Sequence, residues 1–90
     1  MGIGQLNVVI GTPAGVTYHA PIGAAQNYEI DIPAGRRILA AWYHPIDNIP
    51  DLVKFGHIEV APSASGDDLN LLISALTDCE LRIIISYFYL

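Results

Sequence analysis

Three histidines and one cysteine are the residues of this chain that most readily take part in metal binding or catalysis. His19, His44 and His57 lie far apart in the sequence, and no two have the short spacing of a local zinc site. Cys79 precedes Glu80, whose carboxylate disfavours the thiolate that a nucleophile needs. We therefore expect no bound metal and no catalytic cysteine, and we interpret these residues as parts of strands or loops.

Sequence motifs of common enzymes are also missing. The chain has no Gly-x-Ser-x-Gly elbow, no phosphate-binding loop ending in Gly-Lys-Ser/Thr, and no helix motif with paired histidines. Gly2 and Gly4 form a Gly-x-Gly at the start of the sequence, but no strand precedes it, as a dinucleotide-binding motif would require. The sequence therefore predicts a protein that is not an enzyme and binds no cofactor.

The composition indicates that part of the surface is covered by other subunits. The 90 residues are 52% hydrophobic and only 14% charged, although a small chain needs many polar residues to cover its large surface. The net charge of −5, with four basic residues, argues against nucleic acid as a partner. No run of about 20 apolar residues is present, so we expect no membrane-spanning helix and no membrane partner. The single cysteine fits synthesis in a reducing compartment.

Turns divide the chain into short segments. Thr12–Gly15, Ala20–Gly23 and Ile32–Gly35 each have proline second and glycine fourth, which is the residue pattern of a type I turn. Between such turns, Asn27–Ile32 alternates strictly between polar and apolar residues, as expected of a half-buried strand.

The pattern of the whole chain predicts an all-β fold, an antiparallel β-sandwich or jelly-roll-like domain spanning residues 1–90. A helix within Asp67–Leu76, capped by Asp68, is the alternative for that segment. Longer connections are expected at His44–Asp51 and Ala61–Asp68. About seven short strands are expected, at Leu6–Ile10, Val16–His19, Asn27–Ile32, Arg36–Tyr43, Val53–Val60, Asn70–Ala75 and Glu80–Tyr89.

The fourth and seventh of these strands are apolar on both faces. Each sheet of a two-layer sandwich has one face in water, so such strands need a second cover, which a neighbouring subunit would supply. We therefore expect a homo-oligomer. Its predicted interface residues are Leu39, Ala41, Trp42, Tyr43, Ile83, Ile85, Tyr87, Phe88, Tyr89 and Leu90.

Two stretches resemble small β-sandwich modules of bacteriophage virions. Tyr28–Tyr43 is similar to their strand, Pro-Ala-Gly turn, basic residue and apolar strand, and Asn70–Phe88 is similar to their closing hairpin. The resemblance implies a capsid decoration (cement) protein, usually a trimer. It would be made in the host bacterial cytoplasm and located in the virion, with the major capsid protein as its partner. The alternative is a tail, fibre or spike module that binds a host glycan, with Trp42 and Tyr43 beside His44 as the platform on which a sugar stacks.

Overall fold

The computed structural model describes residues 1–90 and is built mainly of strands, which confirms the all-β prediction. One 3-10 helix, η1 (Ile49–Lys54), interrupts them. The strands are β1 (Gly2–Gly11), β2 (Tyr18–His19), β3 (Gln26–Asp31), β4 (Ile38–Asp47), β5 (Phe55–Pro62), β6 (Asp68–Ala75) and β7 (Glu80–Tyr89).

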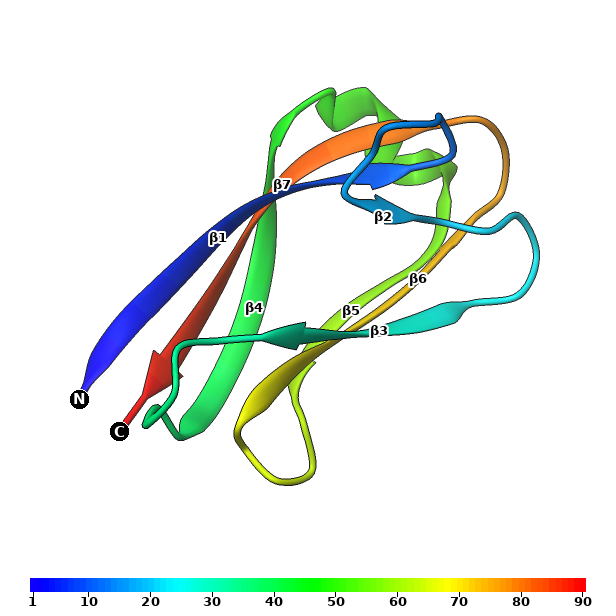
Figure 1. Cartoon of the computed structure of the whole chain (residues 1–90). Helices are drawn as coiled ribbons and strands as arrows, with labels where there is room; N and C mark the ends of the chain where they lie inside the picture. Colours follow the sequence, from blue (N-terminus) through cyan, green and yellow to red (C-terminus); the bar gives the residue numbers. More distant parts are fainter.

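The strands form two sheets, and Figure 1 shows both termini at the same end of the molecule. The four-stranded sheet has the order β2-β1-β7-β4, with β7 antiparallel to both of its neighbours and β2 parallel to β1. The three-stranded sheet has the order β3-β6-β5 and is antiparallel throughout. The central positions of β7 and β6 make these two strands the main contributors to the core.

The hydrophobic core takes side chains from both sheets. Every second residue of each central strand points into it, so Ile83 and Ile85 of β7 share one core with Leu71 and Ile73 of β6. These four side chains have no exposed surface, and burying each stabilises the fold by roughly 1.5–3 kcal/mol relative to exposure. The same alternation in β3 confirms the predicted inward position of Ile30.

Several predicted boundaries are wrong: β1 begins at Gly2 rather than Leu6, and two further errors lie on either side of η1. The connection expected at His44–Asp51 begins only after Asp47, because β4 continues through Pro45. Proline is tolerated there because β4 is the outermost strand of its sheet, where a missing N–H need not break a ladder hydrogen bond. The strand expected from Val53 begins at Phe55, since Val53 belongs to η1, which follows Asn48 in the left-handed conformation (φ 56°).

The remaining local predictions have mixed outcomes. The alternative helix within Asp67–Leu76 is wrong, because the buried positions of β6 follow the two-residue period of a strand. Of the strand expected at Val16–His19, only Tyr18–His19 pairs with a neighbour. The segment Glu80–Tyr89 forms β7 with the predicted bounds.

Candidate functional site on the outer face of the four-stranded sheet

The face of the four-stranded sheet that points away from the core is the main candidate site. Strand register determines which residues share it, because positions opposite each other on paired strands point to the same side. The outer face, as the term is used below, consists of three cross-strand rows: Ile3–Phe88–Ala40, Gln5–Ser86–Trp42 and Asn7–Ile84–His44.

Large apolar side chains on this outer face are open to solvent. Ile3 is 61% exposed and Trp42 is 43% exposed, although both lie on paired strands. Ser86 lies between Gln5 and Trp42 in its row and is only 1% exposed, because these longer side chains flank it. The Gln5 amide nitrogen also donates a long hydrogen bond of 3.5 Å to the Ser86 hydroxyl. The backbone pairing of the sheet therefore fixes the outer face, and its apolar groups are not covered by any other part of this chain.

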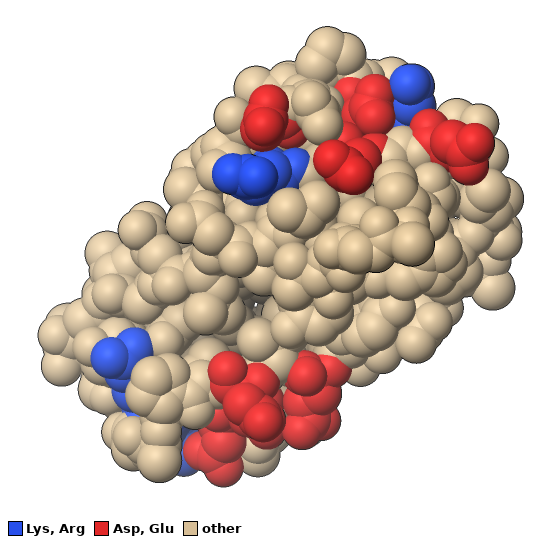
Figure 2. Space-filling view, turned by 45° about the horizontal axis from the view of Figure 1, so that its top comes forward, with Lys and Arg blue, Asp and Glu red and all other residues tan.

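Charged side chains are excluded from the outer face and lie beyond its ends. None of its rows contains Asp, Glu, Lys or Arg, and the next pair along the strands, Asp47 opposite Arg82, is the first charged one. On the side of the molecule shown in Figure 2, charged side chains gather in two groups at opposite ends, with a broad uncharged surface between them. Because the outer face carries no charged side chains, it is suited to bind a partner by burying apolar area rather than by ion pairing.

The structure corrects part of the predicted interface. Ile83, Ile85 and Tyr87 point into the chain's own core and are at most 2% exposed, so they cannot contact a partner. The prediction is wrong for these three residues because β7 lies between β1 and β4 and its inner face is covered by this chain. The three-stranded sheet packs over Ile83 and Ile85, and the loop before β4 packs over Tyr87. Ala41, Tyr43 and Tyr89 are partly buried against the same core.

Four of the predicted interface residues do reach the surface. Trp42 and the half-buried Phe88 lie on the outer face, Leu39 is exposed at a β-bulge between Ile38 and Ala40, and Leu90 follows β7. The sequence interpretation missed Ile3. The signal that could have found it is the period of two along β1, in which Leu6, Val8 and Ile10 point inward and Ile3 therefore points outward.

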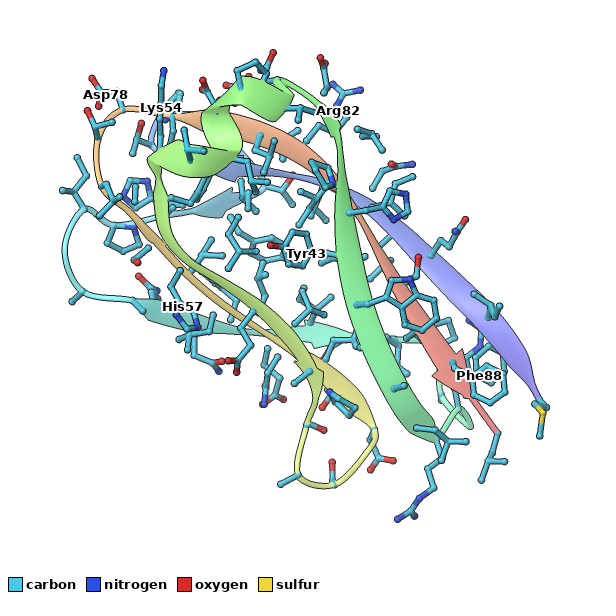
Figure 3. All side chains as sticks on the ribbon, turned by 180° about the vertical axis from the view of Figure 1, so that it is seen from behind. Tyr43, Lys54, His57, Asp78, Arg82 and Phe88 are labelled. Atoms are coloured by element: carbon cyan, nitrogen blue, oxygen red, sulfur yellow. The ribbon has the colours of Figure 1, made fainter.

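The predicted aromatic platform for a sugar is not formed. Trp42 and Tyr43 are adjacent in β4 and therefore point to opposite faces of the sheet. Figure 3 shows Tyr43 extending from β4 toward the interior, where it packs against the core. Trp42 shares the outer face with His44 instead, so the two aromatic rings cannot stack on one ligand.

A cluster of aromatic rings and one arginine closes the core near the termini. The Arg36 guanidinium donates a 2.6 Å hydrogen bond to the Tyr87 hydroxyl and lies 4.4 Å from the centroid of the Tyr89 ring. The Tyr87 ring occupies the space above Gly4 that a Cβ would fill, and Tyr89 lies similarly above Gly2. Here the loop before β4, rather than the other sheet, covers the inner face of the four-stranded sheet.

The histidines and the cysteine occupy separate places. His19, His44 and His57 are all exposed, and His57 lies 3.5 Å from the Glu59 carboxylate. Cys79 is buried, and burial together with the nearby Asp51 carboxylate raises the pKa of its thiol. The raised pKa favours the protonated thiol, which is a poor nucleophile and a poor metal ligand.

Three carboxylates gather where β3 pairs with β6. Oxygens of Glu29, Asp31 and Asp68 lie within 4.8 Å of one another beside an open depression that Asp67 also lines. A hydrogen bond with Asp68 and the negative charge of that residue raise the pKa of Glu29. The group is mostly exposed, and exposed carboxylates are common without a bound ion, so it does not by itself indicate a metal centre.

Comparison of the chain with protein-family models, curated proteins and solved structures found no match. No helix in the structure has the length and hydropathy needed to cross a lipid bilayer.

Proposed function

We propose that this chain is a structural protein of a bacteriophage virion, a capsid decoration (cement) protein that self-associates and binds the outside of the capsid. The observation that carries the proposal is the uncharged outer face, where Trp42 and Ile3 are exposed and Phe88 is half-buried. The finer fold class that we propose is an antiparallel β-sandwich of jelly-roll-like type. The similarity of Tyr28–Tyr43 and Asn70–Phe88 to virion modules supports a location in the virion.

In this proposal the outer face binds the major capsid protein across neighbouring shell subunits. Bursting the shell would then require breaking these added contacts as well as those within the shell. Many weak contacts that are repeated by the symmetry of the shell add to a large total without any one being tight. The net charge of −5 favours the outside of the capsid over its DNA-facing interior, because DNA repels an acidic protein.

The proposal is tested by co-sedimentation of the chain with capsids assembled from the major capsid protein of the same phage. We expect the wild-type chain to sediment with the capsids and Trp42→Ala to bind at least tenfold more weakly. Val53→Ala is the matched control, because Val53 is 80% exposed but lies on η1, away from the outer face. We expect this control to bind as the wild type does.

Equal binding of Trp42→Ala, Val53→Ala and the wild type, or no binding of any of them, would overturn the proposal. Electron cryo-microscopy of the intact particle adds an independent test, because a decoration protein repeats over the shell lattice. Density confined to the tail, together with glycan binding that is lost in Trp42→Ala, would establish the alternative tail or fibre function instead.

A further inference from the structure

One edge of the four-stranded sheet is left open along most of β1. The pairing of β2 with β1 is limited to Ile10 and Gly11. Just before it, the Val9 carbonyl accepts a 2.8 Å hydrogen bond from the Thr17 N–H, and the Val9 N–H donates a 3.0 Å bond to the Thr17 hydroxyl. Residues 2–8 of β1 pair with β7 on one side and with no strand on the other.

The direction of the Val9 backbone groups shows which groups are free farther along β1. In an antiparallel strand the N–H and C=O of one residue point to the same side, and the side alternates with each residue. Because both groups of Val9 point away from β7, those of Ile3, Gln5 and Asn7 do too. These three residues therefore present a regular row of donors and acceptors along the open edge.

The open edge of β1 lacks the protection that the other edges carry. β4 contains Pro45 and has β5 close beside it, β3 contains Glu29 and Asp31, and β5 contains Glu59. Prolines and charges on edge strands prevent them from pairing with other chains. No residue of β1 is charged and none is proline. This edge is therefore open to pairing with another strand.

We propose that β1 pairs with β1 of a second copy of this chain, antiparallel and about a two-fold axis beside Gln5. In this register Gln5 lies opposite itself, and Ile3 lies opposite Asn7 of the second copy. The three facing pairs would form about six backbone hydrogen bonds, two for each pair. A two-fold contact is self-complementary, which suits an uncharged edge because identical charges would otherwise meet across the axis.

The pairing joins the two four-stranded sheets into one continuous sheet. Ile3, Gln5 and Asn7 belong to both the edge and the outer face, so the outer faces of the two copies become continuous. The inference rests on the geometry of β1 and is independent of the proposed capsid function. It replaces the trimer implied by the virion resemblance with a two-fold pair.

Charge substitutions at Gln5 test both the edge and its register. Gln5→Lys and Gln5→Glu each place two like charges opposite each other across the axis. We expect each variant alone to raise the dimer dissociation constant at least tenfold, and an equimolar mixture to recover association as a heterodimer. Sedimentation equilibrium measures all three samples, and thermal unfolding confirms that each variant is folded.

Gln5→Pro is a second test, because it removes an N–H that makes no hydrogen bond to β7, and we expect it to be a folded monomer. Val53→Ala is the control that leaves dimerisation unchanged, since Val53 is exposed on η1 and not on β1. A wild-type chain that is monomeric at high micromolar concentration would overturn the inference, as would association unchanged by the Gln5 substitutions. If capsid binding fails while the mixed Gln5 variants still associate, the proposed function is wrong and this inference stands.

Discussion

Arg36 donates a 2.6 Å hydrogen bond from its guanidinium to the hydroxyl of Tyr87, although the two residues are 51 positions apart in the sequence. The same guanidinium lies over the Tyr89 ring, at 4.4 Å from its centroid. These contacts tie the loop between β3 and β4 to the end of β7. They provide the buried Tyr87 hydroxyl with a charged donor in a part of the core that the three-stranded sheet does not cover.

Replacing Arg36 by alanine therefore removes both the hydrogen bond and the cation–π contact. We expect Arg36→Ala to lower the free energy of unfolding by about 1–3 kcal/mol, as measured by urea denaturation. Arg37→Ala is the matched control, because the Arg37 side chain is exposed, and its effect should stay within about 0.5 kcal/mol. Equal losses in the two variants would contradict a specific role for Arg36.

The close approach of Gly4 to the Tyr87 ring predicts the effect of adding one methyl group. A Cβ at position 4 would overlap the ring, which is buried and cannot move freely. We expect Gly4→Ala to cost about 1–3 kcal/mol of stability through overpacking. In Gly2→Ala the new Cβ meets the hydroxyl end of the half-buried Tyr89 at 2.7 Å, so the loss of thermal stability should be smaller. A larger loss in Gly2→Ala would show that this packing is described wrongly.

Ile83 and Ile84 are adjacent in β7 and point to opposite faces of the sheet, Ile83 into the core and Ile84 to the outer face. Ile83 has no exposed surface, and Ile83→Ala should cost about 2–5 kcal/mol in chemical denaturation. Ile84 lies half-buried on the outer face, so Ile84→Ala should cost less than half as much stability. If the proposed function is correct, Ile84→Ala should also weaken capsid binding. A greater loss of stability in Ile84→Ala than in Ile83→Ala would show that the two faces of β7 are assigned incorrectly.

The Asp51 carboxylate links η1 to the start of β7 and makes stability depend on pH. It accepts a 3.0 Å hydrogen bond from the Glu80 N–H and lies 3.1 Å from the Lys54 ammonium. These contacts hold the pKa of Asp51 below its usual value of 3.8. The folded state therefore releases this proton more readily than the unfolded state. The resulting stability is complete above the unfolded pKa and is lost as the pH falls through the folded one.

We accordingly expect Asp51→Asn to be less stable than the wild type at pH 7 and to lose less stability between pH 5 and pH 2. Thermal midpoints measured across this range test the expectation. Asp78→Asn is the control, because Asp78 is exposed and its side chain makes no hydrogen bond or ion pair. If the thermal midpoints of the wild type and Asp51→Asn fall in parallel as the pH is lowered, the prediction for Asp51 is wrong.

Local chemistry made most strands predictable. Strict alternation identified β3, and a proline with a following glycine marked turns at which Gly15 and Gly35 have φ values of 90° and 86°. Predictions were wrong where tertiary context overrides a local rule. Pro45 reads as part of a connection in the sequence, yet it continues β4 because an edge strand tolerates proline. The β-bulge between Ile38 and Ala40 also shifts which residues of β4 share a face.

The candidate site was predictable only in outline. A strand with apolar residues on both sides indicates that both sides are covered, and β7 is such a strand. Which side faces the core depends on the other strands, so Ile83, Ile85 and Tyr87 were assigned to a partner although this chain buries them. Ile3 was missed because the predicted strand began at Leu6, whereas β1 begins at Gly2 and includes Ile3. Its position beside Phe88 follows only from the register of β1 with β7.

By itself, the amino-acid order determined the strand character, the turns and the excess of apolar surface, because these depend on neighbouring residues and on composition. Only the tertiary structure decided which apolar face remains open and which strand edge has no partner. The physical reason is that burial and backbone pairing are properties of strands brought together from distant parts of the chain. Thus β1 and β7, from opposite ends of the sequence, lie side by side and together define the outer face.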